Sequence, residues 1–181
     1  VSSYVGHYSD TCGAGHVQRV PTAAPLNNSC GLDMALLSVQ FQHPGLRATM
    51  GLQFGDIAAS AWSPDFNWIQ EANAGFRLHP KFWIDAGFFR THLGLESIQP
   101  RENICQSIAL VTYVEPYYLS GFKLSWLAAN HLTFQAQVLN SFNGFTESNH
   151  RKAVGLSCMY EPGRRLSVTS NLLFSDDSPD G

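Results

Sequence analysis

Polar and charged residues recur at every second position along several apolar stretches of the chain. This is the spacing at which side chains leave a β-strand on the same face. Guanidinium, ammonium, carboxylate and amide groups gathered on one face can hydrogen-bond water and bias the movement of ions. They can equally pair with one another and brace neighbouring strands, and the sequence leaves both roles open. The candidate residues are Arg47, Gln53, Glu71, Asn73, Arg77, Asp85, Lys123, Gln135 and Gln137.

Catalytic chemistry has no comparable pattern. The chain contains 7 histidines, but it has no HExxH metal-binding motif, no GxSxG nucleophile motif and no phosphate-binding P-loop. His43, His79 and His131 fall in expected turns. The strand pattern brings no set of serine, histidine and acid together. We therefore expect no enzymatic activity, no metal site and no cofactor.

The composition excludes several classes of protein. Charged residues make up 14% of the 181 residues, against about 25% in a typical soluble domain. The net charge of −3 provides no basic surface for nucleic acid. Aromatic residues at 12% argue against long disorder. No apolar run reaches the roughly 18 residues of a transmembrane helix.

Period-2 alternation predicts that the elements carrying these residues are β-strands. In 132–138, Leu132, Phe134, Ala136 and Val138 alternate with Thr133, Gln135 and Gln137. The predicted strands are 2–9, 33–42, 47–54, 68–78, 82–89, 122–128, 132–138, 152–160 and 166–174.

Short and long connections alternate between these strands. The short ones carry turn residues at 43–45, 79–81, 129–131 and 161–164, and the long ones span 10–30, 58–67, 91–116 and 143–150. Alternate connections of an up-and-down barrel lie at the same end, so this order is typical of an outer-membrane barrel. The strands, at roughly 8 to 11 residues, also match a tilted bilayer crossing.

Alternation alone does not say which face is outside. A soluble barrel or sandwich buries its apolar face, whereas a membrane barrel turns that face to lipid. The polar face here is poor in Lys and Glu, and aromatic residues gather near strand ends, which favours the membrane. These aromatics are Phe41, Trp62, Phe66, Trp68, Phe82, Trp83, Phe88, Phe89, Tyr117, Tyr118, Phe142 and Phe145.

Several residue blocks of the chain are distinctive. They include Trp83-Ile84-Asp85-Ala86-Gly87-Phe88-Phe89 and His92-Leu93-Gly94-Leu95-Glu96-Ser97, together with 67–75, 115–121 and 138–142. These blocks resemble the OmpL-like beta-barrel porin family of Gram-negative outer membranes, and 71–96 is the specific part of the resemblance. The resemblance implies an all-β, antiparallel, up-and-down transmembrane β-barrel. In this chain Asn103-Ile104-Cys105-Gln106-Ser107 lacks the arginine that the family often has after the glutamate.

The resemblance also bears on the extent of the domain. Family members are longer, so we expect residues 1–181 to be one incomplete barrel domain of about nine strands, whereas bacterial barrels have even strand numbers. The chain starts at Val1 without a signal peptide, and we interpret both ends as truncations. Cys12 and Cys30 flank one loop, where they could pair in an oxidising compartment or stay unpaired.

The long segment 91–116 carries His92, Glu96, Arg101 and Glu102, followed by an apolar run at 108–114. An apolar run is out of place in an exposed loop, so the segment should pack against something. By resemblance to porins, one interpretation is a loop folded into the lumen as a constriction. The alternative is an extra strand pair, 106–114 with 117–127.

We therefore expect an outer-membrane porin. Its partners would be outer-membrane lipid and the small hydrophilic solutes or ions that diffuse passively through its polar lumen, with no nucleic acid. The nine candidate residues of the first paragraph would then be pore-lining. A soluble ligand-binding β-barrel and a structural outer-membrane barrel with a blocked lumen remain alternatives. The sequence leaves open whether the protein is a homo-oligomer.

Overall fold

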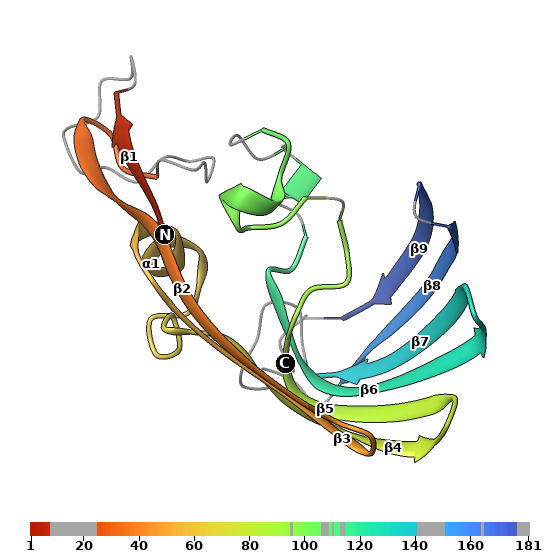
Figure 1. The fold of residues 1–181 in the computed structure, drawn as a ribbon. Helices are drawn as coiled ribbons and strands as arrows, with labels where there is room; N and C mark the ends of the chain where they lie inside the picture. The colour runs from red at the N-terminus through yellow and green to blue at the C-terminus, as the bar shows by residue number, and fades with distance from the viewer. Residues whose placement is uncertain are drawn as a thin grey trace. The chain divides into compact units, whose positions relative to one another are not determined.

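The computed structural model describes residues 1–7, 25–94, 96–105, 109, 111–112, 115–140, 151–163 and 165–176. Within them, nine strands form one antiparallel sheet in which each strand is hydrogen-bonded to the next, in the order β1 to β9 (Figure 1). The expected all-β, up-and-down topology is confirmed. The elements are β1 (Ser2–Gly6), β2 (Ser29–His43), β3 (Leu46–Phe54), α1 (Asp56–Ala61), β4 (Ile69–His79), β5 (Phe82–Arg90), η1 (Pro100–Glu102), β6 (Tyr118–Ala129), β7 (Leu132–Leu139), β8 (Ala153–Gly163) and β9 (Leu166–Phe174).

Several elements differ from the sequence-based expectation. β2 begins at Ser29 rather than at residue 33, because backbone pairing with β1 continues through Cys30 and Gly31, where side-chain alternation gives no signal. β6 begins at Tyr118 rather than at residue 122, and β8 extends to Gly163 rather than ending at residue 160. Helix α1 overlaps the start of the expected loop 58–67. A helix of under two turns is too short to show a helical period, and its burial of Ile57 and Ala58 stabilises it instead. No helix of the described residues has the length and hydropathy needed to cross a membrane.

The short turns between the paired strands follow a regular pattern. The carbonyl of Gly45, in the β2–β3 turn, accepts a hydrogen bond of 3.0 Å from the Arg77 backbone amide in β4. The carbonyl of Lys81, in the β4–β5 turn, accepts one of 2.9 Å from the Leu127 amide in β6. The carbonyl of His131, in the β6–β7 turn, accepts one of 2.8 Å from the Glu161 amide in β8. Each of these turns is thus hydrogen-bonded to the strand that follows its own hairpin. The three turns therefore lie at the same end of the strands.

The chain forms two compact units, and we describe each by itself. The first comprises Val1–Ser38, Gly51–Gln70 and Gly94–Tyr117. Around α1, Tyr4 donates a hydrogen bond of 2.7 Å to Asp56. Trp62 is buried and stacks on Tyr117 with ring centroids 5.9 Å apart. Trp62 is therefore a core residue, and its expected place in an aromatic belt is wrong.

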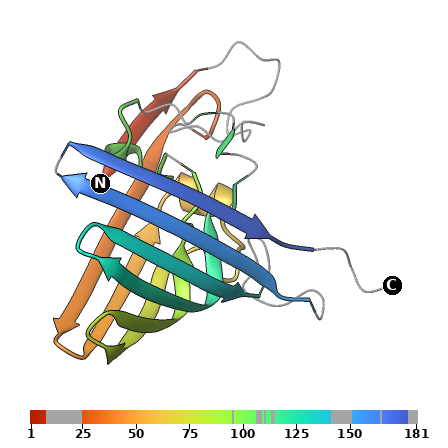
Figure 2. The same cartoon turned by 90° about the vertical axis from the view of Figure 1, so that its right-hand side faces the viewer.

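The second unit comprises Val39–Met50, Glu71–Leu93 and Tyr118–Gly181, and it contains the hairpins β6–β7 and β8–β9 that lie side by side in Figure 2. Cross-strand register gives this unit two contrasting faces. On one face Phe122 pairs with Val138, and these side chains are 60% and 51% exposed. On the other, Asp85, Lys123 and Gln137 form one row across β5, β6 and β7. Asp85 and Gln137 are each only 2% exposed. The apolar side chains are therefore exposed, whereas the polar side chains in the middle of the other face are buried.

The polar face becomes apolar toward the end that carries the long connections. Leu119, Leu139 and Ala153 form a buried cluster there, with Leu173 packed against it. Register places these residues on the same face as Asp85 and Lys123. The side chains of this face are therefore polar in its middle and aliphatic and buried at one end.

Candidate pore-lining site

The polar face of the second unit contains a pocket of about 400 Å³. The strands β3 to β7 supply its lining, because alternate residues of each strand point to this face. Of the predicted pore-lining residues, Arg47, Glu71, Asn73, Asp85, Lys123 and Gln135 lie in its wall. The remaining lining residues are Thr49, Pro80, Lys81, Trp83, Ser125, Leu127 and Thr133.

An ion pair between β3 and β5 lies in this wall. Arg47 Nε donates to Asp85 Oδ1 at 2.6 Å, and Arg47 Nη2 donates to Asp85 Oδ2 at 2.5 Å. The fork of a guanidinium matches both oxygens of a carboxylate, so the pair is directional as well as electrostatic. Gly75 faces Asp85 in the β4–β5 register. A Cβ atom at this position would overlap the Asp85 carboxylate, so the absence of a side chain at Gly75 makes room for the pair.

Trp83 is a platform for two cations. The guanidinium carbon of Arg47 lies 4.5 Å from the centre of its ring, and that of Arg77 lies 5.2 Å away. Next along the strand face, Lys123 Nζ lies 4.4 Å from the centre of the Phe89 ring. Trp83 and Phe89 thus face the polar side of the sheet, which corrects their expected place in a membrane-facing belt. The sequence could have indicated this orientation. Trp83 and Phe89 lie an even number of residues from Asp85 in the same strand, so alternation places all three on one face.

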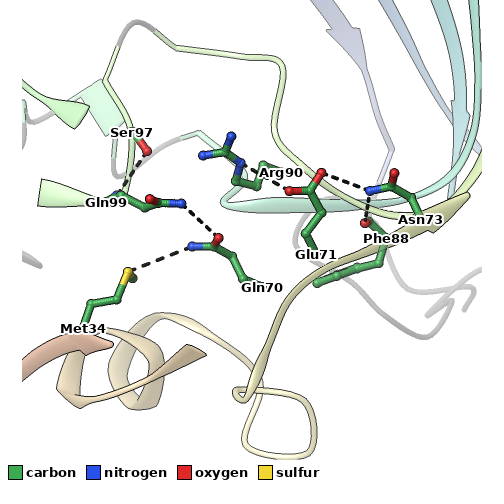
Figure 3. A network of polar contacts seen from close by, with 8 residues as sticks. All are labelled: Met34, Gln70, Glu71, Asn73, Phe88, Arg90, Ser97 and Gln99. Carbon is green, nitrogen blue, oxygen red and sulfur yellow. Dashed lines mark hydrogen bonds and ion pairs between the residues drawn. The ribbon is translucent and has the colours of Figure 1, made fainter. Parts of the chain in front are cut away.

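A second ion pair joins β4 and β5 (Figure 3). Arg90 Nε lies 3.6 Å from Glu71 Oε2, and Asn73 Nδ2 donates to Glu71 Oε1 at 3.0 Å. The same Asn73 amide donates to the Phe88 carbonyl at 3.2 Å, which fixes its orientation. Arg90 was missed by sequence reasoning because the predicted strand ended one residue earlier.

The remaining predicted pore-lining residues have different surroundings. Arg77 is exposed beside Trp83, and Gln137 is buried in the row that contains Lys123. Gln53 belongs to the first unit, where it is fully buried and donates a hydrogen bond of 3.0 Å to the Asn67 carbonyl. Gln53 does not line the pocket, and its assignment to a pore wall stays a prediction.

His92 follows β5 and packs against β8 within the second unit. A Cβ atom at Gly155 would lie 3.0 Å from His92 Cε1, so the bare glycine backbone accommodates the imidazole. Burial lowers the pKa of His92, and the nearby Lys123 lowers it further, while the Leu172 backbone opposes this shift. Burial therefore favours the neutral form of the imidazole. The segment after β5 thus crosses onto the polar face at its first residues.

Glu96, Arg101 and Glu102 belong to the first unit. Glu96 accepts a hydrogen bond of 2.5 Å from the Ala109 amide, and the Arg101 and Glu102 side chains are exposed. Burial raises the pKa of the neighbouring Glu115, and repulsion by Glu96 raises it further. These three residues belong to a different unit from the pocket residues, and their role as a constriction stays a prediction.

The stretch 97–103 is held by its own hydrogen bonds and by β4. The Ser97 amide donates to Asn103 at 2.8 Å, and Asn103 donates back to the Ser97 carbonyl at 2.6 Å. Buried Gln99 donates at 2.9 Å to Gln70, which approaches Met34 Sδ at 4.0 Å (Figure 3). This stretch is packed, as expected for the long segment. Most of the apolar run 108–114 lies outside the described residues, but the alternative strand pair of 106–114 with 117–127 is wrong. Both edges of β6 are hydrogen-bonded to other strands, one to β5 and the other to β7, and Val111 and Thr112 are not in a strand.

Metal ligands and thiols can be located only in the described part of the chain. This part holds no group of three or more His, Cys, Asp or Glu side chains arranged to bind a metal ion. Within this part, Cys30, Cys105 and Cys158 are free thiols. Cys12 lies outside the described residues, so the expectation for its pairing with Cys30 is not addressed.

Comparison with known proteins gives one match. The model of the family described as "Putative beta-barrel porin-2, OmpL-like" matches residues 1–181. Searches of curated proteins and of solved structures find no match to the chain. The family match covers the whole chain and agrees with the antiparallel topology and with the polar wall beneath an exposed apolar face. This chain belongs to the OmpL-like beta-barrel porin-2 family.

Proposed function

We propose that this chain forms part of the wall of an outer-membrane pore through which small hydrophilic solutes or ions diffuse passively. The observation that carries the proposal is the inversion of the two faces in the second unit. Leu124, Phe122 and Val138 are exposed on the apolar face, while the polar face holds buried Asp85 and Gln137. A soluble barrel buries the first face, whereas a membrane barrel presents it to lipid and lines its lumen with the second.

The aromatic side chains near the short turns support the same proposal. Phe82, Trp126 and Phe134 form one row across β5, β6 and β7 on the apolar face. Phe82 stacks on Trp126 at 5.8 Å, and Trp126 stacks on Phe134 at 5.6 Å between ring centroids. Amphipathic and aromatic rings gather where the hydrocarbon core meets the headgroups. This row, close to the short turns, fits a membrane interface.

The mechanism needs no covalent step and no cofactor. Solutes would pass by the Arg47, Asp85 and Gln135 side chains, which exchange hydrogen bonds with the solute's water shell. The contact of His92 with Gly155 supports the proposal that the 91–116 segment begins by turning inward and narrows the passage.

A pair of matched substitutions tests which face meets lipid. Phe122→Arg places a cation on the apolar face, and Gln135→Arg places one in the pocket wall. In a membrane barrel, an arginine on the lipid face costs about 2–4 kcal/mol near the bilayer centre, and one facing the lumen costs much less. We therefore expect full-length Phe122→Arg to insert poorly into lipid vesicles and Gln135→Arg to insert normally.

The same assay discriminates the alternatives. Equal insertion of both variants, or full-length protein that stays monodisperse without detergent, would contradict the membrane proposal and favour a soluble β-protein. Conductance across a planar bilayer then separates an open pore from a blocked structural barrel. Inserted protein that opens no channels would contradict passive diffusion.

A further inference from the structure

The carboxylates of the pocket wall are both engaged by cations. Asp85 accepts two hydrogen bonds from Arg47. Glu71 lies in an ion pair with Arg90 and accepts a hydrogen bond from Asn73. An ion pair has little net charge at a distance, so neither carboxylate is a strong site for a passing cation.

Further cations lie on the same polar face outside these ion pairs. The guanidinium carbon of Arg77 lies 5.2 Å from the centre of the Trp83 ring, beside the pocket, and no ion pair of the described residues includes Arg77. Lys123 lies across from Asp85, with its Nζ 4.4 Å from the centre of the Phe89 ring, and Lys81 lies at the turn that borders the pocket. The polar face around the pocket therefore carries more positive than negative charge.

The stacking makes these cations suited to meeting an anion. A guanidinium beside an indole ring still presents N–H donors to an anion, and it is weakly hydrated compared with an ammonium group. The aromatic ring restricts its motion, so less side-chain entropy is lost when an anion approaches. Positive charge in a narrow passage with low-dielectric walls also raises the local concentration of anions.

We propose that this wall makes the pore prefer small anions over cations, with Arg77 and Lys123 as the residues that the anion meets. The inference rests on the proposed function, because it requires a pore. It adds that the preferred solutes are small anions. In this proposal the ion pairs of Asp85 and Glu71 keep these carboxylates from attracting cations.

The test is the reversal potential of the full-length protein in a planar bilayer under a KCl gradient. We expect chloride to permeate better than potassium. Arg77→Gln should lower the chloride-to-potassium permeability ratio about two- to five-fold, the effect of one charge about 5 Å from the ion after screening. Asp85→Asn should raise the ratio, because it leaves Arg47 uncompensated. A general loss of packing would not shift the permeability ratio in opposite directions in Arg77→Gln and Asp85→Asn.

Arg165→Gln is the matched control, because it removes an equal charge from the exposed β8–β9 turn, away from the pocket. Its ratio should stay that of the unmodified protein. Should Arg77→Gln fail to fold, Arg77→Lys keeps the charge and should keep the preference. Potassium preference in the unmodified protein, or equal ratios for Arg77→Gln and Arg165→Gln, would overturn the inference while leaving the pore intact. Absence of any channel would instead refute the proposed function.

Discussion

Breaking the Arg47–Asp85 pair is the most direct perturbation of the wall. In Arg47→Gln the Asp85 carboxylate, whose side chain is 3% exposed, loses both of its Arg47 hydrogen bonds. Removing one partner of a fully buried pair costs about 3–5 kcal/mol, and an exposed pair contributes about 0–1 kcal/mol. Arg47 is 37% exposed and borders a polar pocket, so we expect an intermediate cost of about 2 kcal/mol.

The reverse substitution should cost less. In Asp85→Asn the guanidinium of Arg47 remains stacked on Trp83 and is partly reached by water, so we expect a loss of about 1 kcal/mol. The double variant lacks the uncompensated buried charge. Its destabilisation should therefore be smaller than the sum of the two single effects by about 1–2 kcal/mol.

The assay is urea unfolding of the full-length protein from lipid vesicles, followed by tryptophan fluorescence. Trp83 contacts Arg47 and so reports on this part of the wall. The pair Arg151–Asp176, whose side chains are 61% and 46% exposed, provides the control cycle. Its coupling should stay below about 1 kcal/mol. Additivity of the Arg47 and Asp85 effects to within about 0.5 kcal/mol would refute a direct pair in the folded wall.

Three further predictions concern the loop and its contacts. Because burial and Glu96 raise the pKa of Glu115, the folded state holds this proton more tightly than the unfolded state does. Acidification below neutral pH should therefore raise the amide protection factors near Glu115, once the intrinsic pH dependence of exchange has been divided out. Glu115→Gln should remove this rise, and its persistence in the variant would assign it to another group. Gly155→Val should push His92 out of its contact and raise the pKa of His92 toward its ordinary value, which NMR titration measures. Gly163→Ala is the control, because the Cβ position of Gly163 has open space around it, and it should leave the pKa of His92 unchanged. An unshifted pKa in Gly155→Val would count against the contact. Deleting 97–106 should raise single-channel conductance if the loop narrows the pore, and unchanged conductance would rule out a constriction there.

The sequence predicts the strands well because their signals are local. Alternation along 132–138 and turn residues at Pro80 and Asn130 need no distant partner, and the observed β7 and the β4–β5 and β6–β7 turns agree with them. Helix α1 and the early start of β2 were missed because burial and pairing with β1 stabilise them rather than a local pattern.

The candidate site was predicted as a list of residues without its contacts. Each strand indicates which residues share a face, so Arg47, Glu71, Asp85 and Lys123 could be grouped correctly. The sequence does not say that Arg47 pairs with Asp85 while Glu71 pairs with Arg90. Those choices depend on cross-strand register, and a register shift of one residue would turn the side chains to the other face.

By itself, then, the sequence determined the alternation, the turns and the family resemblance, since these depend on neighbouring residues along the chain. Tertiary structure alone decided which face is exposed, because a period-2 pattern is the same whether its apolar side meets a core or a lipid. It also decided that Trp83 supports two arginines, that Gly75 makes room for Asp85, and that Gly155 receives His92. These contacts join residues that are far apart in sequence, and only folding brings them within hydrogen-bond and van der Waals distance.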